Sequence, residues 1–362
     1  MILKYLLLLL VVGTATIHAC KPCDKTGTVI TDSPEYSFET QFRALFFKPG
    51  ANNLYYAAEA FPFDTAIPDQ VISPHWNIYD VHPTYRFGFD VGFRTVFHTR
   101  QSSLYANWEH FQSTTSQTAL AVSTPTYPNP MMGPFSSIGP DAAGYDIAAQ
   151  GCVSFYFNEV NLRYGQYVIF GDYLETNFFG GISFADLHQE MRSSYTGTGD
   201  IAQVITVPTS FIGAGPQFGF DFSYDIVKGL NFTGQVTTAL LMGTGKNHTN
   251  YASFSPLLAA GGDPVPNLQN TCVQNKMKVV PSLSERLGLA YFLPFRNHYM
   301  AKLEVGFEAK IFLNAFESTN LASGVIDVTP YDNTVGVFAR TFERTVSSFS
   351  LSGPYIAFSM AL

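Results

Sequence analysis

Residues 85–98 read YRFGFDVGFRTVFH, and apolar and polar positions alternate along the whole segment. One row is mostly aromatic and consists of Tyr85, Phe87, Phe89, Val91, Phe93, Thr95 and Phe97. The other row consists of Arg86, Gly88, Asp90, Gly92, Arg94, Val96 and His98. Successive side chains of a β-strand point to opposite faces, so the segment predicts a strand with one apolar and one polar face.

Segment 299–314 repeats this pattern. One face carries Tyr299, Ala301, Leu303, Val305, Phe307, Ala309, Ile311 and Leu313, and the other carries Met300, Lys302, Glu304, Gly306, Glu308, Lys310, Phe312 and Asn314. Ordinary strands have about 5–6 residues, whereas a tilted strand that crosses a bilayer needs at least ~9–11. The length of both segments therefore favours a membrane barrel. A secreted β-sandwich or jelly roll, whose strands also alternate, is the alternative.

The same periodicity predicts ten strands, separated by gaps that are alternately long and short. Short gaps such as 99–102 are typical of periplasmic turns, and long gaps such as 113–152 are typical of external loops. The predicted strands are 36–48, 84–98, 103–112, 153–168, 174–188, 211–225, 229–243, 277–292, 298–314 and 347–362. Because 54–61 and 334–343 are candidates for further strands, we predict an all-β fold, a transmembrane antiparallel up-and-down β-barrel of 10 to 14 strands. Ten strands would leave a narrow lumen.

The N-terminus reads as a targeting segment. Residues 1–19 place Lys4 ahead of an apolar run from Leu6 to Val12 and end at Ala19, the layout of a secretory signal peptide cleaved near that residue. The cleavage region also faintly resembles a lipoprotein site, in which Cys20 would carry lipid. We expect residues 20–35 to form a periplasmic segment and 36–362 to form the barrel, in the outer membrane of a Gram-negative bacterium.

Composition excludes several classes of protein. Only 13% of the 362 residues are charged, 15% are aromatic, and the formal net charge is −8. Nucleic-acid binding requires clustered Lys and Arg, so an acidic balance argues against nucleic acid as the partner. With 46% hydrophobic residues the chain is also unlike a disordered protein. A large, charge-poor, aromatic-rich fold remains.

Five stretches rich in glycine and aromatic residues carry a resemblance. They are FGFDVGF (87–93), NWEHF (107–111), FIGAGPQFGFDFSY (211–224), KVVPSLSERLGLAYF (278–292) and LEVGFEAKIFLNAF (303–316). These stretches resemble the Legionella-type major outer membrane protein family, also found in chlamydia-like bacteria. The resemblance implies a pore-forming outer-membrane β-barrel that is abundant at the cell surface. The chain departs from it at Leu362, where such barrels commonly end in Phe, and at Cys20-Lys21-Pro22-Cys23.

If the apolar rows face lipid, the polar rows face the lumen. The positive pore-lining candidates are Arg43, Arg86, Arg94, Arg163, Arg286, Lys302 and Lys310, and the negative ones are Glu39, Asp90, Glu109, Glu159, Glu175, Asp221, Glu304 and Glu308. Because the two sets nearly balance, we expect weak charge selectivity. Pairing of these charges across strands to stiffen the barrel is the alternative role. Glu285 falls on the apolar row of its segment, which predicts a register shift or bulge near Pro281.

Motifs for catalysis are absent from the sequence. It contains no HExxH, paired-Cys zinc spacing or GxSxG, and only Asp186 and His188 form a suggestive pair. We therefore predict a protein that is not an enzyme and has no cofactor or metal. Two functions stay open: a porin for passive diffusion of small hydrophilic solutes, and a surface-exposed structural protein or adhesin acting through its long loops. The expected partners are outer-membrane lipid, lipopolysaccharide and, in a homo-oligomer, further copies of the chain.

The sequence contains four cysteines. Cys20 and Cys23 precede the first strand, whereas Cys152 and Cys272 belong to predicted external loops. Export favours oxidation, and a bilayer would separate the two pairs. The sequence thus predicts a Cys152–Cys272 disulfide, with free thiols or intermolecular bridges as the alternatives.

Overall fold

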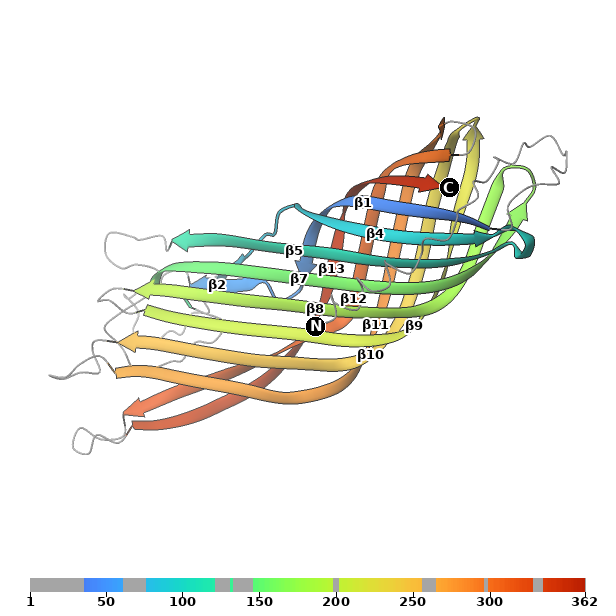
Figure 1. Ribbon diagram of the computed structural model, residues 1–362. Helices are drawn as coiled ribbons and strands as arrows, with labels where there is room; N and C mark the ends of the chain where they lie inside the picture. Colours follow the sequence, from blue (N-terminus) through green and yellow to red (C-terminus); the bar gives the residue numbers. More distant parts are fainter. Residues whose placement is uncertain are drawn as a thin grey trace, which may run out of the picture.

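The computed structural model describes residues 36–60, 76–120, 131–132, 146–197, 202–255, 265–295, 299–327 and 335–361. Nearly all of these residues belong to β-strands (Figure 1). No helix in these ranges is long and apolar enough to cross a membrane. The predicted signal peptide and the segment with Cys20 and Cys23 lie outside the described residues.

Ten long antiparallel strands close into a ring (Figure 1). The strands are β1 (Tyr36–Ala51), β4 (Arg86–Phe97), β5 (Ser102–Leu120), β7 (Asp146–Phe170), β8 (Leu174–Gly197), β9 (Ala202–Val227), β10 (Leu230–Ser255), β11 (Val265–Phe295), β12 (Tyr299–Asp327) and β13 (Val335–Ala361). The order around the ring is β7-β5-β4-β1-β13-β12-β11-β10-β9-β8, and β8 pairs with β7 to close it. The predicted fold class is therefore confirmed, at the lower limit of the predicted strand number.

Each of the ten predicted strands corresponds to one strand of the ring. Most observed strands are longer at the end opposite the short turns, so that the wall continues where external loops were expected. Within the predicted segment 334–343, residues 335–343 are part of this extension of β13, and within 54–61 the short strand β2 covers Tyr55–Ala60. β2 pairs with β3 (Trp76–Asp80) and with β6 (Met131–Met132), which in turn pairs with β7.

The register fixes the tilt of the strands. Following directly paired residues once around the ring, from Lys48 on β1, leads back to Tyr36 on the same strand. A displacement of this size in a ten-stranded barrel corresponds to a tilt of about 40°. The turns near 98–101, 171–173 and 228–229 lie at the same end as the C-terminus (Figure 1), and we take this as the periplasmic end because short turns are periplasmic.

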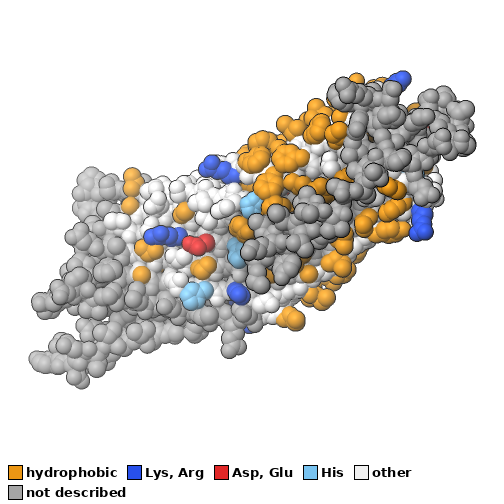
Figure 2. Space-filling model, in the orientation of Figure 1, with side chains coloured by type: hydrophobic (Ala, Val, Ile, Leu, Met, Phe, Trp, Pro, Cys, Tyr) orange, Lys and Arg blue, Asp and Glu red, His pale blue; other side chains and the backbone are white. Residues whose placement is uncertain are grey.

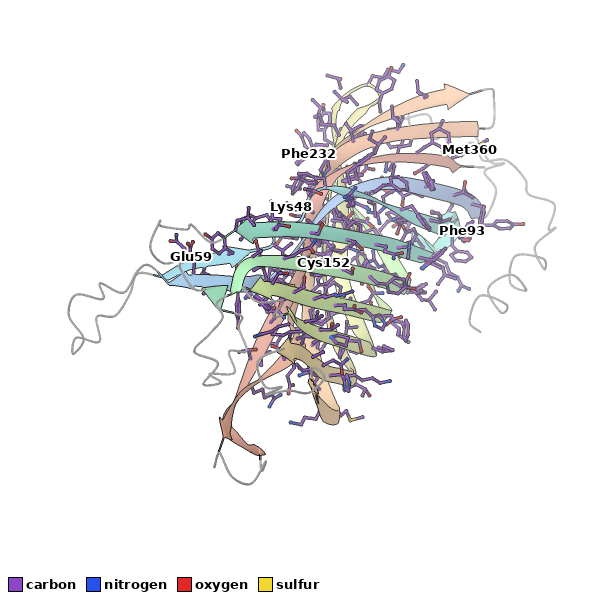
Figure 3. The ribbon with its side chains drawn as sticks, turned by 90° about the vertical axis from the view of Figure 1, so that its left-hand side faces the viewer. Lys48, Glu59, Phe93, Cys152, Phe232 and Met360 are labelled. Carbon is purple, nitrogen blue, oxygen red and sulfur yellow. The ribbon has the colours of Figure 1, made fainter. Side chains whose placement is uncertain are left out.

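The outer face carries an apolar band next to the periplasmic end. Hydrophobic side chains cover that half of the wall in Figure 2, and mostly uncharged polar surface follows. Phe93 projects outward within the band (Figure 3). The last apolar outward-facing residue before the polar surface marks the upper edge of the band on nine strands: Phe46, Phe87, Trp108, Val160, Phe184, Ile212, Met242, Leu313 and Pro354. An outward apolar band on a closed barrel is the lipid-contacting surface of a membrane-spanning β-barrel.

Glu285 lies on this apolar band. The predicted register shift near Pro281 is wrong, because pairing is continuous from Leu230–Tyr291 beyond Leu240–Pro281, and the irregularity of this strand pair lies at Gly245/Asn247. Glu285 is exposed and faces outward between Leu283 and Leu287. Its direct partners, Val236 and Ala309, both lie below the upper edge of the band on their strands. The strand therefore keeps its register and leaves one carboxyl facing lipid.

Candidate functional site

The lumen contains nearly all the predicted site residues and has a layered organisation. From the periplasmic end outward it consists of a polar vestibule, a charged layer, an aromatic layer and a segment of chain at the outer mouth. Alternation along the strands places the side chains of each layer inward, as period two requires.

The vestibule is a cavity with about 300 Å³ of space for water, and it lies near the periplasmic end. Its charged lining residues are Glu39, Arg94, Glu175, Asp221, Arg286, Lys302 and Glu304. Arg94 and Asp221 approach to 3.3 Å, and Lys302 Nζ lies 2.7 Å from Glu304 Oε2. The cavity is therefore lined by both signs of charge in nearly equal number.

The charged layer lies above the vestibule and is almost entirely buried. Arg43, Asp90, Glu109 and Glu159 lie directly opposite one another on the neighbouring strands β1, β4, β5 and β7. Arg43 bonds to Asp90, with Nη2 3.1 Å from Oδ2, and Asn107 donates a further hydrogen bond to Asp90. The register thus aligns one cation and three carboxylates along one wall.

Glu308 and Lys310 reach this layer from β12, which lies five strands from β7 around the ring. Arg43 Nη1 lies 2.6 Å from Glu308 Oε2, and Lys310 Nζ lies 2.5 Å from Glu109 and 2.8 Å from Glu159. The six charged side chains are at most 10% exposed. Ion pairs of this kind connect the two walls and close the lumen at this level.

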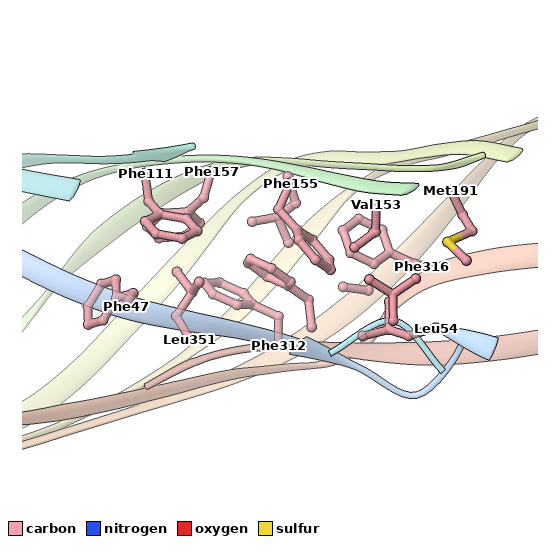
Figure 4. Packing of buried hydrophobic residues seen from close by; sticks show 14 of the residues in the cluster. Phe47, Leu54, Phe111, Val153, Phe155, Phe157, Met191, Phe312, Phe316 and Leu351 are labelled. Carbon is pink, nitrogen blue, oxygen red and sulfur yellow. The ribbon is translucent and has the colours of Figure 1, made fainter. Parts of the chain in front are cut away.

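The aromatic layer lies above the charged layer. Side chains from opposite walls meet in the lumen (Figure 4), and they include Phe47, Phe111, Phe155, Phe157, Phe312, Phe316, Phe349 and Leu351, all at most 1% exposed. Phe349 is central: its ring centroid lies 5.6–6.1 Å from those of Phe155, Phe157, Phe312 and Phe316. This filling leaves the ten-stranded barrel closed, since a narrow barrel can be filled by its own side chains.

A segment of chain packs inside the outer mouth. We call residues 52–60 and 76–82 the lid segment, and it lies at the end of the barrel opposite Phe93 and Met360 (Figure 3). Tyr195 donates a hydrogen bond to the carbonyl of Tyr56, whose ring lies against Gly151, where a Cβ atom would be 2.5 Å away. Gly151 is therefore required for this close approach.

Further hydrogen bonds attach the lid segment to other strands. The amide of Asn52 donates to Ser347 Oγ at 2.9 Å, Gln189 Nε2 donates to Asn53 Oδ1 at 3.0 Å, and the amide of His82 donates to the Gln117 side chain at 3.1 Å. These partners belong to β13, β8 and β5. The lid segment therefore bridges separate parts of the wall.

Within the lid segment, the Tyr79 hydroxyl donates to buried Glu59 at 2.6 Å. This hydrogen bond, with burial, raises the pKa of Tyr79 to about 12, and burial raises the pKa of Tyr56.

Most predicted pore-lining residues lie where the alternation placed them. Two lie apart from these layers. Arg163 faces inward, donates to Gln217 Oε1 at 3.2 Å and stacks on Phe179. Arg86 is exposed at the outer end of β4. Pairing across strands, the alternative role given above, is present in the charged layer.

Sequence reasoning missed the aromatic layer and the lid segment as a closure. A signal existed, because both rows of 153–157 contain apolar residues and Phe312 interrupts the polar row of its segment. The inward row of β1 likewise turns from Arg43 to Leu45 and Phe47.

Two other predicted sites are placed by the structure. Asp186 and His188 are close, with 2.7 Å between Oδ1 and Nε2, but they lie on the outward row of β8. Cys152 has a free thiol, and three strands, β8, β9 and β10, separate β7 from the strand that carries Cys272. A disulfide needs Cα atoms within about 7 Å, so the predicted Cys152–Cys272 bridge is not formed in the structure. Among the described residues, no group of three or more His, Cys, Asp or Glu side chains is arranged to hold a metal ion.

Comparison with known proteins gives one match at the level of sequence families. Residues 32–362 match the family model described as Legionella pneumophila major outer membrane protein precursor. No curated protein matches the chain.

Several solved structures are similar at low identity. The outer membrane protease OmpT from Escherichia coli is 9% identical, with 91% of this chain and 98% of that chain covered and a TM-score of 0.39. The TodX deltaS2S3 mutant monoaromatic hydrocarbon channel is 8% identical, with 91% of each chain covered and a TM-score of 0.30. The P. putida toluene transporter TodX is 6% identical, with 91% of this chain and 90% of that chain covered and a TM-score of 0.18.

Proposed function

The chain belongs to the Legionella major outer membrane protein family, and we propose that it is an outer-membrane porin for small hydrophilic solutes, closed in the conformation described above. The vestibule carries this proposal. It is a polar cavity inside a membrane-spanning barrel, and its lining offers charged and hydrogen-bonding groups to a hydrated solute. Its charges nearly balance, which supports weak charge selectivity.

Opening requires the upper layers to move. The charged layer must exchange partners, the rings around Phe349 must separate, and the lid segment must leave the outer mouth. Apolar constrictions gate pores by excluding water, so the aromatic layer is the main barrier in this proposal. Conduction should accordingly be rare and of small amplitude at rest.

Recordings from the refolded full chain in a planar bilayer test the proposal. We expect infrequent small ohmic steps, and a reversal potential near zero in a salt gradient. Phe349→Ala should raise the open probability, whereas Phe358→Ala, on the outward face of the same strand, should not. Silence from protein that is folded by heat-modifiability, with both variants silent as well, would contradict a porin.

A surface structural or adhesive role is the second candidate, and one observation favours it. The strands continue beyond the apolar band as a polar wall, as on β7 from Asn158 through Ser154 to Gln150. Such a wall would present the external loops well above the membrane. Normal cell attachment by a strain whose external loops are shortened would argue against this role. Assembly into a homo-oligomer stays a prediction.

A further inference from the structure

A group of aromatic, imidazole, amide and carboxyl side chains lies on the outer face of β4, β5, β7 and β8, where the apolar band ends. We call it the rim cluster, and its members are Phe89, Trp108, His110, Tyr156, Asn158, Asp186 and His188. Neighbouring rings contact one another: Phe89 meets Trp108 edge-on at 5.2 Å, and Tyr156 lies 5.5 Å from His110 and 5.6 Å from His188. The rings form one continuous surface across four strands.

Polar side chains of the rim cluster are held in place, and those of Asp186 and His188 are partly exposed. Asn158 Oδ1 accepts a hydrogen bond from Trp108 Nε1 at 3.4 Å and lies 2.8 Å from His110 Nδ1. His188 Nε2 lies 2.7 Å from Asp186 Oδ1, and these side chains are 45% and 25% exposed. Fixed, partly exposed polar groups beside aromatic rings are suited to binding a ligand with both apolar and hydroxyl surfaces.

The outward side chains change in character from below the rim cluster to above it. Below it are exposed apolar side chains such as Leu162 and Ile182. Above it are Gln112, Thr114 and Ser154, and the hydroxyls of the last two lie 3.0 Å apart. This order of apolar, ring and hydroxyl surfaces matches the order of acyl chains, headgroup and outer sugars in a glycolipid.

The rim cluster differs from a general aromatic girdle, which would surround the barrel at the membrane interface. The edge of the band is aromatic on β1, β4, β5 and β8, at Phe46, Phe87, Trp108 and Phe184, and is Val160 on β7. On β9, β10, β12 and β13 it is formed by Ile212, Met242, Leu313 and Pro354, none of them aromatic. Lipid contact, which is the same all around the barrel, therefore does not by itself explain why aromatic rings gather on one side of it. The rings are concentrated on the side of the barrel formed by β1, β4, β5, β7 and β8.

Charge identifies the kind of ligand. Among the described residues, the outward rows of β4, β5, β7 and β8 carry a single cation, Arg192, which lies four residues beyond His188 on β8 and opposite Cys152. Asp186 adds a carboxyl beside His188. A phosphate group would need clustered cations, whereas a neutral sugar packs its C–H face on an aromatic ring and its hydroxyls on amide, carboxyl and imidazole groups. We propose that the rim cluster binds a core sugar of outer-leaflet lipopolysaccharide. This inference does not depend on the proposed porin function.

The chain offers its own reporter for a test. Trp76 and Trp108 are its two tryptophans, so Trp108 is the single fluorophore in the full chain with Trp76→Phe. The folded variant is titrated in detergent with rough lipopolysaccharide that retains core sugars, with lipid A, and with phosphatidylglycerol. We expect a saturable shift in Trp108 emission with affinity about tenfold higher for lipopolysaccharide than for lipid A. Equal affinity for lipid A or phosphatidylglycerol, or affinity lost in high salt, would assign the effect to acyl chains or phosphate and overturn the proposal.

Variants locate the site. In the same background, His188→Ala and Tyr156→Leu should each weaken lipopolysaccharide binding by about tenfold, while Met242→Ala on another part of the band edge should not. Soluble core oligosaccharide should compete with lipopolysaccharide. Heat-modifiability confirms that each variant is folded. Failure of competition, or equal binding by the rim-cluster and control variants, would show that the rim cluster does not recognise sugar.

Discussion

The two halves of the lumen are built by the same ten strands and are filled in opposite ways. The periplasmic half keeps a cavity whose charges pair loosely, as between Arg94 and Asp221, which are 24% and 19% exposed. The outer half buries Phe349 and its neighbours completely, with their rings in contact, as in a soluble core. Between them, Arg43 and Lys310 connect the walls. The closure of this barrel is therefore local and comes from particular inward side chains rather than from strand number alone.

Replacing one arginine in the charged layer and one in the vestibule should give the largest difference in unfolding free energy. Arg43→Ala leaves Asp90 and Glu308 buried without their main cation, and breaking a buried pair in this way typically costs about 3–5 kcal/mol. Arg94→Ala in the vestibule should cost at most about 1 kcal/mol, because its partner is reached by water. Urea unfolding followed by heat-modifiability measures both. Equal losses would mean that the two layers do not differ as described.

Two phenylalanines of β13 test the aromatic layer. Phe349→Ala removes a ring that contacts four others and should cost about 3–5 kcal/mol of unfolding free energy. Phe358→Ala, 50% exposed on the outward face, leaves no internal cavity and should cost clearly less. The same unfolding assay applies. A larger loss for the outward residue would contradict the inward packing.

Alkaline pH tests the lid segment at the outer mouth. The pKa of Tyr79 is raised to about 12 in the folded lid, so its stabilising contribution is complete below pH 10 and is lost as pH rises from about 10 to about 12. Tyr79→Phe removes the hydrogen bond to buried Glu59 and should destabilise the lid by about 1–3 kcal/mol.

A spin label on Asn52→Cys, in a chain without its other cysteines, reports lid mobility. We expect an immobile label at pH 9 and a mobile one near pH 11.5, and in Tyr79→Phe a mobile label already at pH 9. A label that stays immobile up to pH 12 in a folded barrel would show that Tyr79 does not hold the lid segment.

Glu285 and Glu308 lie on neighbouring strands, and replacing each of them compares the effect of a carboxyl on the outer face with that of one in the lumen. Glu285→Gln removes a lone charge from the apolar band and should stabilise the barrel, by less than the roughly 2–4 kcal/mol that Arg or Lys costs at the bilayer midplane. Glu308→Gln removes a charge bonded to Arg43 and should destabilise it. Stability that falls in both variants would place Glu285 in a contact absent from the structure.

Much of the barrel could be predicted from the sequence, because period two reports directly which side of a strand each residue occupies. The ten strands and the inward position of Arg43, Asp90, Glu308 and Lys310 followed from that rule. The closed lumen could not be predicted in this way. Alternation shows that Phe312 faces inward, but it does not show which side chain from the opposite wall Phe312 contacts. Glu285 departs from the prediction for a related reason: a charge on an apolar row predicts a register shift, but pairing partners, not polarity, decide register.

The rim cluster could not be predicted from the sequence either. Asp186 and His188 are two residues apart and could be identified as a pair, but Trp108 and Tyr156 come from other strands that only the register brings beside them. Long-range pairing is the information that a single sequence lacks.

Sidedness of thiol labelling tests whether the vestibule is reached from the periplasmic side and is separated from the outside by the layers above it. In a chain whose four cysteines are replaced, Ser223→Cys lines the vestibule and Leu351→Cys lies in the aromatic layer. The protein is inserted in one orientation into a bilayer, and a membrane-impermeant thiol reagent is added to either side. We predict that position 223 reacts only from the periplasmic side and that position 351 reacts from neither. Equal labelling of position 223 from both sides would contradict a closed outer half of the lumen.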